Sequence, residues 1–517
     1  MEIYKNKALL IRTRNPGKYA LIPGHLRVDD DTIAVRWGLD EVRVLVNLGV
    51  KNVPSPIYRN YEWPCRYPSV FAHQKKTSAD ITMYHRLFVL SEPGVGKTLS
   101  VLWAADYLMR VGAVRRMLVV CPLSIVHSAW MGDIARSVIH RSAIVCHHSS
   151  AEQRRNIVRG DHEIVITNYD GLHIIADAVA KDGRFDLIVA DECNHLKNME
   201  TTRWKSFVKM LTPNTRVCMM TGTPAAQSPL DAYALAKVVN PDGVPKFFGG
   251  WRDLTMIKVS MHRWVPKPSA KHLVYEAMQP SIRFTKAECL DLPPVLTETR
   301  VVTLTAQQLR YYNTIRRTAV IKAAGETITA VNAAALVSKL LQISAGAAYS
   351  DGHDVVQFDC KPRLKVLTEV LEQTERKVLV FALFRSSIET IVQHLSNLGV
   401  SYGEIHGGVT SKRRATLINR FQTEDEPRVM VMQPQASAHG ITLTAADTVV
   451  FYGPLMSVEQ YVQCCARADR QGQTSDKVTV VHIQGSPIEE EMFKALSSKV
   501  NAHQAVASLF GEVLQIS

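Results

Sequence analysis

The sequence contains no C-x-x-C pair, and its nine cysteines are scattered, with only Cys464 and Cys465 adjacent. This spacing argues against a disulfide framework and against a cysteine-based zinc site, and it is typical of a reducing compartment. The chain also lacks an apolar run of about 18 residues, so no membrane span is expected. Residues 1–14 have no long apolar core and do not resemble a secretory signal.

Short-period repeats and low-complexity segments are also absent. The composition is that of an ordinary globular protein, 46% hydrophobic and 21% charged, and the 517-residue length predicts about two to four domains. Lysine and arginine total 61 against 48 acidic residues, which gives a net charge of +13. This surplus is consistent with a polyanionic partner such as nucleic acid, although basic proteins without such a partner are common.

A phosphate-binding loop is predicted at SEPGVGKT, residues 91–98. It follows an apolar run at 87–90 and precedes a helical pattern at 99–109, which is the strand–loop–helix context that a P-loop needs. Gly94 and Gly96 allow the backbone to turn tightly and to bring its N–H groups onto phosphate oxygens.

Two side chains of this loop have predicted roles. Lys97 would contact the β- and γ-phosphates, and Thr98 would supply a hydroxyl to Mg²⁺, while the helix N-terminus adds its dipole. The first position of the motif is Ser91 rather than glycine, so the strict P-loop pattern is not met. The alternative is a glycine-rich turn before a helix.

The predicted fold class is α/β, with two parallel-sheet lobes, a helical insertion between them and a small β-rich N-terminal module. Continuous apolar strands separated by helices indicate parallel sheets covered on both faces. The predicted strands of the two lobes are 87–90, 117–121, 164–167, 187–190, 217–220, 378–381, 402–405, 429–432, 448–451 and 478–483. The predicted domains are 1–69, 70–245, 246–360 and 361–517.

The N-terminal module is predicted to contain strands at 8–12 and 32–37 and a short helix at 39–48. A proline-rich connector, 52–68, follows it. The connector's aromatic side chains could stack on bases or could pack the linker onto the next domain, and both readings stay open.

An acidic pair, Asp191 and Glu192, closes the predicted strand 187–190. Ligands of open parallel sheets bind at the carboxyl ends of the strands. Asp191 is therefore expected to hold Mg²⁺, through water, and Glu192 to orient and deprotonate the attacking water. A simple helix N-cap is the alternative.

Two further segments fit a nucleotide site. Gln74 lies upstream of the P-loop, and its amide can read the adenine edge, unless it is an ordinary surface glutamine. The run 221–224, Thr-Gly-Thr-Pro, follows another predicted strand and would suit a rigid relay between the γ-phosphate and DNA. A plain β-turn is the alternative there.

In the second lobe, Arg467 and Arg470 are three positions apart and are predicted to project from one helix face. Paired guanidinium groups suit a phosphate across a cleft, as arginine fingers. A solvated basic face would explain such a pair equally well.

The ordered set of motifs resembles superfamily-two ATPases, and specifically the Swi/Snf-like translocases of double-stranded DNA. The resemblance covers residues 72–517. The similar segments are LVVCPLSIVHSAW at 118–130 (motif Ia), ITNYDGL at 166–172 (motif Ib), DECNHLKN at 191–198 (motif II), TGTPAAQSPLDAY at 221–233 (motif III), SIRFTKAECLDLPP at 281–294, KVLVFALF at 377–384 (motif IV), IHGGVTSKRRATLINRFQ at 405–422, SAHGITLTAA at 437–446 (motif V) and QCCARADRQGQ at 463–473 (motif VI). The resemblance implies that the fold is α/β with two RecA-like parallel-sheet lobes.

The resemblance implies roles for single residues. Gln74 would hold adenine, while Lys97, Thr98, Asp191 and Glu192 would bind and hydrolyse MgATP. Arg467 and Arg470 would complete the site from the second lobe. The residues expected in motifs that track the DNA backbone are Ser124, Thr167, Asn168, His406, Gly440 and Thr442. Contacts to the phosphates of the DNA backbone carry no information about the base sequence.

The chain departs from the family pattern at three positions. Ser91 stands where the family usually has aspartate, Asn194 where motif II usually has histidine, and Asp469 where motif VI often has histidine. The metal, base and arginine positions are kept. These replacements therefore bear on how the ATP state is coupled to the grip on DNA rather than on hydrolysis.

The sequence therefore predicts an ATP- and Mg²⁺-dependent translocase on double-stranded or branched DNA, used for DNA remodelling, branch migration or protein displacement. The alternative is a strand-separating DNA or RNA helicase, although no wedge, ratchet or iron–sulphur domain is recognisable in the sequence. Replication, recombination or transcription proteins are candidate partners, and a monomer is expected. The expected location is the cytoplasm of a bacterial or phage-infected cell, with the nucleus less favoured.

Overall fold

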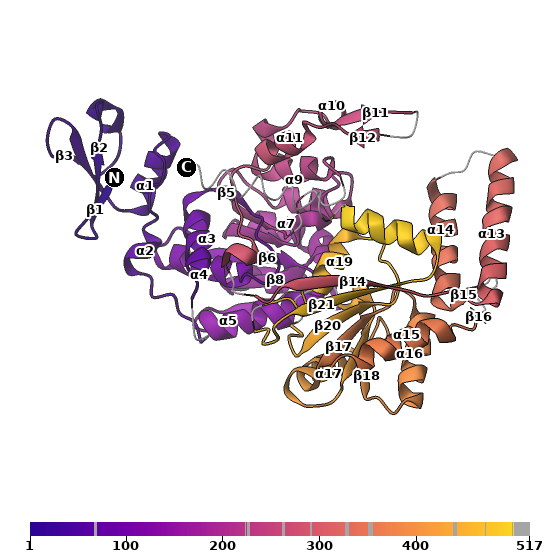
Figure 1. The fold of residues 1–517 in the computed structure, drawn as a ribbon. Coiled ribbons are helices and arrows are strands. Elements are labelled where there is room, and N and C mark those ends of the chain that lie inside the picture. The colour runs from indigo at the N-terminus through magenta and orange to yellow at the C-terminus, as the bar shows by residue number, and fades with distance from the viewer. Residues whose placement is uncertain are drawn as a thin grey trace. The chain divides into compact units, whose positions relative to one another are not determined.

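The computed structural model describes residues 1–66, 70–222, 224, 228–260, 264–289, 292–325, 330–349, 355–437, 442–470, 472–498 and 500. The chain forms two compact units, Met1–Cys289 and Leu290–Ala502 (Figure 1). Each unit contains a parallel sheet with its own hydrophobic core. The predicted α/β fold, with two parallel-sheet lobes and a small β-rich N-terminal module, is confirmed.

The N-terminal module is a four-stranded antiparallel sheet in the order β1-β2-β4-β3, followed by helix α1. Its elements are β1 (Glu2–Tyr4), β2 (Ala8–Arg12), β3 (His25–Arg27), β4 (Thr32–Arg36) and α1 (Leu39–Asn47). Alternate residues of β2 and β4 are buried, and they pack with Val42 and Leu45 of α1 into a small core of their own. The predicted strands and helix of this module are confirmed.

The connector between this module and the first parallel sheet packs onto the P-loop helix. It contains the short helix α2 (Ile57–Asn60), and its Tyr61 is only 5% exposed. Trp63 and Trp103 pack edge to face, with ring centroids 5.7 Å apart, and the indole N–H of Trp103 donates to the carbonyl of Pro64 at 2.8 Å. Tyr61 and Trp63 therefore have a packing role in the connector.

The first parallel sheet has seven strands in the order β13-β5-β10-β9-β6-β8-β7, and every neighbouring pair is parallel. Its strands are β5 (Arg86–Val89), β6 (Arg116–Cys121), β7 (Ala143–Val145), β8 (Ile164–Asn168), β9 (Phe185–Asp191), β10 (Arg216–Met220) and β13 (Ser281–Ile282). The five strands predicted for this lobe are confirmed to within two residues at each end.

Helices cover both faces of this sheet. Successive side chains of a strand point to opposite faces, so neighbouring residues of one strand belong to different core clusters. Phe88 belongs to the core cluster on one face, together with α7, α8, α9 and α11, whereas Leu87 and Val89 belong to the cluster on the other face, together with α4 and α5. The helices of this unit are α3 (Ala72–Met83), α4 (Lys97–Arg110), α5 (Gly132–Ser137), α6 (Ala151–Arg159), α7 (Leu172–Asp182), α8 (Thr202–Lys209), α9 (Asp231–Val239), α10 (Phe248–Thr255), α11 (Ala270–Ala277) and α12 (Lys286–Cys289).

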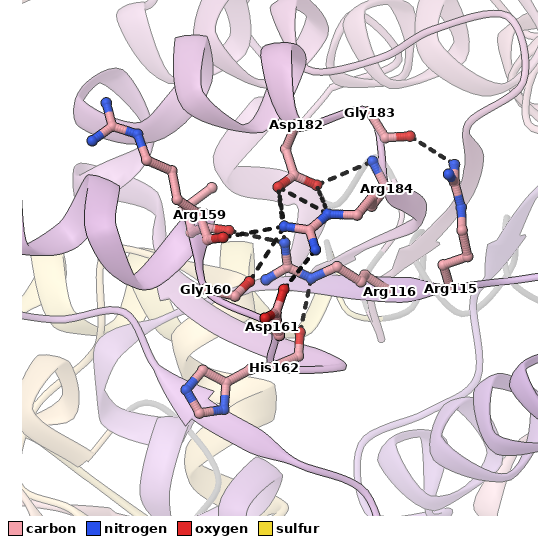
Figure 2. A network of polar contacts seen from close by, with 10 residues as sticks. Arg115, Arg116, Arg159, Gly160, Asp161, His162, Asp182, Gly183 and Arg184 are labelled. Atoms are coloured by element: carbon pink, nitrogen blue, oxygen red, sulfur yellow. Dashed lines mark hydrogen bonds and ion pairs between the residues drawn. The ribbon is translucent and has the colours of Figure 1, made fainter.

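A buried ion-pair network ties together the amino ends of β6 and β9 (Figure 2). Arg116 is 3% exposed; it pairs with Asp182 at 3.1 Å, and its guanidinium lies 4.2 Å from the ring centroid of Phe185. Arg184 binds the same carboxylate at 2.7 Å. This network lies at the edge of the sheet opposite to the carboxyl ends, so its role is to hold strands and helices together.

The segment predicted as a helical insertion, 246–360, is divided between the two units. Its first part adds α10, α11, the hairpin β11 (Met256–Lys258) and β12 (Trp264–Pro266), and β13 to the first unit. Its second part adds β14 (Val295–Val301), the helices α13 (Ala306–Gly325) and α14 (Ala330–Ala345), and the hairpin β15 (Ala347–Tyr349) and β16 (Val355–Gln357) to the second unit. Helices α13 and α14 lie side by side (Figure 1).

The second parallel sheet has six strands in the order β14-β21-β20-β17-β19-β18, all parallel. Besides β14, they are β17 (Lys377–Phe381), β18 (Tyr402–Ile405), β19 (Val429–Met432), β20 (Ala446–Phe451) and β21 (Val478–Gln484). The helices are α15 (Lys361–Glu372), α16 (Arg385–Asn397), α17 (Ser411–Thr423), α18 (Pro434–Ser437) and α19 (Val458–Cys465), of which α15 and α16 pack on one face and α17 and α19 on the other.

Candidate nucleotide-binding and catalytic site

The predicted catalytic segments of the first unit lie at one edge of its sheet. All strands of this sheet are parallel, so the residues that follow their carboxyl ends meet along the same edge. The P-loop follows β5, the acidic pair closes β9, and Thr221 follows β10. Motif Ia follows β6, and Asn168 is the last residue of β8. The topology thus brings together segments that span 131 positions of the chain, from 91 to 221.

The P-loop has the backbone that its glycines allow. Gly94 and Gly96 have φ values of 94° and 85°, a region that other residues rarely adopt, and helix α4 begins directly after them at Lys97. A Cβ on Gly96 would lie 2.1 Å from Nε2 of Gln74, so glycine is also needed there for close approach.

Lys97 lies beside the P-loop backbone and near the acidic pair. Its ammonium donates to the carbonyls of Ser91 at 2.8 Å and Glu92 at 3.1 Å. Its positive charge also opposes the rise in the pKa of Asp191. A cation and a carboxylate therefore face the same space at the end of β5 and β9.

Asp191 is 6% exposed, and burial raises its pKa. The indole N–H of Trp130 opposes this rise, because it donates to Oδ2 of Asp191 at 3.0 Å, and the backbone N–H of Glu192 donates to Oδ1 at 3.1 Å. The Tyr169 hydroxyl donates to the carbonyl of Asp191 at 2.8 Å. Trp130, from motif Ia, thus orients this carboxylate, and Tyr169, from motif Ib, holds the backbone of the same residue.

Glu192 has a φ of 54°, in the left-handed region that costs a non-glycine residue about 1–3 kcal/mol. It precedes the short 3₁₀ turn Cys193–Leu196, and its side chain makes no capping hydrogen bond to that turn. A helix cap therefore does not explain Glu192. Strained backbone of this kind gathers at functional sites, where the surrounding structure holds it.

Gln74 contacts the P-loop directly. Its amide N–H₂ donates to the carbonyl of Val95 at 3.3 Å, and its amide oxygen accepts from the N–H of Phe71 at 3.2 Å. It is 4% exposed, so it is not an ordinary surface glutamine. The amide keeps one further N–H and one further lone pair for a ligand, and its role toward adenine stays a prediction.

A hydrogen bond joins motif II to motif III. The Asn194 amide donates from Nδ2 to the hydroxyl of Thr221 at 3.0 Å, and Thr221 is fully buried. Gly222 packs against the P-loop, since a Cβ there would lie 2.7 Å from Cδ of Pro93. Thr223 lies outside the described residues. Asn194, which replaces the histidine usual in the family, therefore still links the acidic turn to motif III.

The segment that leads out of the first unit is bound to the P-loop. The guanidinium of Arg283, which is 3% exposed, donates to the carbonyl of Leu90 at 2.9 Å and to the carboxylate of Glu92 at 3.4 Å. The N–H of Phe284 donates to the hydroxyl of Ser91 at 3.0 Å. Ser91 thus contributes an acceptor to this contact.

In the second unit, the predicted single helix face carrying Arg467 and Arg470 is wrong. Helix α19 ends at Cys465, and both arginines lie in the turns that follow it. The carbonyl of Arg467 accepts from the backbone N–H of Leu443 at 3.0 Å, so motif V, rather than a further helical turn, binds it. Arg467 is 5% exposed, and its part in catalysis remains a prediction.

The predicted DNA-contacting residues differ in exposure. Ser124 is exposed, whereas Thr167 is 1% exposed and donates to the carbonyl of Cys146 at 3.4 Å. Asn168 is 9% exposed. In the second unit, His406 and Thr442 are half-buried, and Nδ1 of His406 accepts from the N–H of Gly408 at 3.1 Å. Gly440 lies outside the described residues.

All nine cysteines are free thiols. Among the described residues, no group of three or more histidine, cysteine, aspartate or glutamate side chains could hold a metal ion by itself. In the same ranges, no helix is long and apolar enough to cross a membrane.

Together, the two parallel-sheet units and the P-loop edge define an α/β nucleotide-binding protein of the two-lobed helicase type. Residues 73–346 match the SNF2-related domain, and residues 362–472 match the helicase conserved C-terminal domain. The first match covers more than half of the 517 residues, so the chain belongs to the SNF2-related family.

Similar proteins carry related names. The chain is 27% identical, over 407 residues, to the SWI/SNF-related matrix-associated actin-dependent regulator of chromatin subfamily A-like protein 1 of Xenopus tropicalis, covering 75% of this chain and 40% of that protein. It is 24% identical to human DNA annealing helicase and endonuclease ZRANB3, covering 75% and 36% of the two chains. The chain therefore spans 40% or less of the length of these relatives. A solved structure, the Sulfolobus solfataricus SWI2/SNF2 ATPase core in complex with dsDNA, has a TM-score of 0.43 and 18% identity, covering 89% of this chain and 97% of that one.

Proposed function

We propose that the chain is an ATP-dependent motor that steps along double-stranded DNA. The observation that carries the proposal is the gathering of Lys97, Asp191 with Glu192, and Thr221 at one edge of a parallel sheet in a chain of the SNF2-related family. A lysine, an acidic pair and a hydroxyl-bearing turn are the groups that hydrolysis of a nucleoside triphosphate needs.

ATP would bind over the P-loop. The N–H groups of the loop and the N-terminus of α4 point at the position of the phosphates, and Lys97 would neutralise the β- and γ-phosphates. Gln74 would contact adenine with the N–H and lone pair that Phe71 and Val95 leave unused. Glu192 would accept a proton from the attacking water.

The residues present fit Mg²⁺. Thr98 at the start of α4 and Asp191 at the end of β9 supply the hydroxyl and carboxylate oxygens that this ion prefers. The burial that raises the pKa of Asp191 also creates a low-dielectric site, where a cation favours the ionised carboxylate. The ion would supply charge neutralisation for the phosphates, while Trp130 orients the carboxylate and Tyr169 holds the backbone carbonyl of Asp191.

Arg467 and Arg470 would complete the ATP site from the second unit. The bond from Leu443 to the carbonyl of Arg467 connects motif V, a predicted DNA-tracking segment, to the first of these arginines. ATP binding would close the units on each other, and hydrolysis would release them, which moves the DNA contacts of one unit relative to the other. Since both halves of the site are in one chain, we propose a monomer as the working unit.

The DNA side of the proposal is supported by the net charge of +13, by the family and by the names of the relatives. Contacts to phosphates by Ser124, Thr167, Asn168, His406, Gly440 and Thr442 would be independent of base sequence. Buried Thr167 could act through backbone groups or after a local rearrangement of its strand end.

The test is the rate of ATP hydrolysis by the purified chain alone and with duplex DNA, single-stranded DNA or RNA. We expect the largest stimulation with duplex DNA, and Glu192→Gln should bind ATP without turning it over. Stimulation by RNA or single strands alone would contradict the proposed substrate. Absence of hydrolysis under all conditions would contradict the proposed activity.

A further inference from the structure

A cleft of about 640 Å³ lies between the N-terminal module and the far end of the P-loop helix. Its walls come from the end of β4, the start of α1, the connector helix α2 and the last residues of α4. Four arginines line it: Arg36, Arg43, Arg59 and Arg110. Asp40 is the one acidic side chain among the lining residues.

The cleft is separate from the proposed ATP site. Helix α4 starts at Lys97 and ends at Arg110, and its 14 residues span roughly 20 Å at 1.5 Å per residue. The ATP phosphates would lie at its N-terminus, whereas Arg110 lines the cleft at its C-terminus. The predicted DNA-tracking residues do not line the cleft either.

Two of the arginines have structural partners. Arg110 binds the buried carboxylate of Asp106 at 3.0 Å and lies over the ring of Tyr61. Arg43 donates to the carbonyl of Thr82 at 3.1 Å, and burial lowers its pKa. These contacts hold both guanidinium groups in place at the wall.

The other two arginines have less to do in the fold. The side chain of Arg59 makes no hydrogen bond or ion pair with any residue that the structure describes, whereas its backbone N–H donates to the carbonyl of Pro56 at 2.9 Å. Burial raises the pKa of the Tyr107 hydroxyl, and the charges of Arg43 and Arg59 oppose that rise. Arg36 pairs with Glu41 at 3.1 Å, but its side chain is 71% exposed. Three carboxylates pair with arginines of the cleft, Glu41 with Arg36, Asp40 with Arg43 and Asp106 with Arg110. The four arginines therefore leave a net positive charge at the cleft, which an anion bound there would offset.

We propose that this cleft binds a phosphate group. Arginine is suited to this task because its planar fork of N–H donors matches phosphate oxygens. The aromatic side chains Trp37 and Tyr61 are 3% and 5% exposed, so their rings offer little surface on which a base could stack. Their polar atoms already donate to Pro54 and Asp106. A backbone phosphate therefore fits this cleft better than a base. The source is either a phosphodiester of duplex DNA or a free phosphate compound. The assignment of the phosphate to duplex DNA rests on the proposed function, whereas the binding of a phosphate group in this cleft does not.

The test uses Arg59→Gln and the double variant Arg36→Gln, Arg59→Gln. The matched control is Arg14→Gln, an exposed arginine of the same module outside the cleft. Binding of a labelled duplex is measured by fluorescence anisotropy across a salt series. Binding of inorganic pyrophosphate is measured by calorimetry with ADP saturating the P-loop. Circular dichroism checks the fold.

If the ligand is DNA, Arg59→Gln should weaken duplex binding roughly fivefold for every base sequence and reduce the salt slope by about one. Arg59→Lys should restore part of the affinity, and Arg14→Gln should behave like the wild type. If the ligand is a free phosphate compound, only pyrophosphate binding should weaken. Unchanged binding of both probes by a folded double variant would overturn the proposal. Failure of duplex to stimulate ATP hydrolysis would contradict the proposed motor, but the pyrophosphate arm would still decide on the cleft.

Discussion

The guanidinium of Arg283 donates to the carbonyl of Leu90 at 2.9 Å, although the two residues are 193 positions apart. Leu90 directly precedes the P-loop, and Arg283 lies in the segment that continues into the second unit. The same guanidinium donates to the carboxylate of Glu92, and the backbone N–H of Phe284 donates to the hydroxyl of Ser91. The P-loop is therefore bound directly to the segment that leads out of the first unit.

Replacing this arginine is the first prediction. Arg283→Gln removes a buried, charge-assisted bond and should lower the free energy of unfolding by about 1.5–3 kcal/mol. It should also reduce ATP turnover more than ATP binding, because the P-loop itself is unchanged. The control is Arg203→Gln, which breaks an exposed pair with Asp170 and should cost less than about 1 kcal/mol. Equal effects of the two substitutions on denaturant unfolding would contradict the role given to Arg283.

The second prediction concerns Lys97. Lys97 donates to the backbone carbonyls of Ser91 and Glu92 in its own loop, and we expect Lys97→Ala to leave the fold intact. Losing a charge aimed at the phosphates should reduce ATP turnover by about 10²- to 10³-fold or more. Lys181→Ala, which changes an exposed lysine on α7, is the control. Normal turnover by folded Lys97→Ala protein would show that the P-loop assignment is wrong.

The third prediction is a shift in pH dependence. Burial raises the pKa of Asp191, and the Trp130 N–H opposes that rise by binding the carboxylate. Trp130→Phe removes this donor, so the pKa should rise further and the acid limb of ATP hydrolysis should move to higher pH. Activity should fall on the acid side and recover on the alkaline side or with more Mg²⁺.

The control for Trp130→Phe is Trp103→Phe. It removes an equally buried indole whose N–H binds the carbonyl of Pro64, which does not titrate. Trp103→Phe should therefore change stability without moving the acid limb. An acid limb in the same place for Trp130→Phe and the wild type would count against the contact as a determinant of the Asp191 charge.

The fourth prediction tests the Asn194–Thr221 bond with a double-mutant cycle. Asn194→Ala, Thr221→Val and the double variant should show a coupling of about 0.5–1.5 kcal/mol in unfolding, because each single change removes the same bond. DNA-stimulated turnover should fall in all three variants. Asn198→Ala, four positions after Asn194, is the control, because its side-chain oxygen accepts from the N–H of Glu200 at 2.9 Å, within its own loop. Strictly additive effects would mean that the two motifs are not coupled here.

The strands and the P-loop could be predicted from the sequence because their signals are local. Continuous apolar runs identified both sheets, and glycines beside a lysine identified the loop. The end of α19 could not be predicted in this way. Arg467 leaves the helical pattern because Leu443, 24 positions earlier, binds its carbonyl, and no local pattern records that contact.

The groups that orient the catalytic residues were missed for the same reason. Trp130 lies 61 positions from Asp191, and in the sequence it is one aromatic in an apolar stretch. The arginines of the N-terminal cleft come from four separate elements, so only the fold brings them together. Sequence patterns give the residues predicted to react, whereas the residues that position them depend on contacts across the sheet.

The last prediction concerns the output of the motor. A protein that grips the phosphates of one strand can advance without opening base pairs, and melting each pair costs about 1–2 kcal/mol of stacking. We therefore expect duplex-stimulated ATP hydrolysis that displaces the third strand of a triplex and leaves blunt or tailed duplexes closed. Triplex displacement and fork unwinding are to be run side by side with ATP, with Lys97→Ala as the inactive control. Efficient unwinding of tailed duplexes without triplex displacement would instead identify a strand-separating helicase.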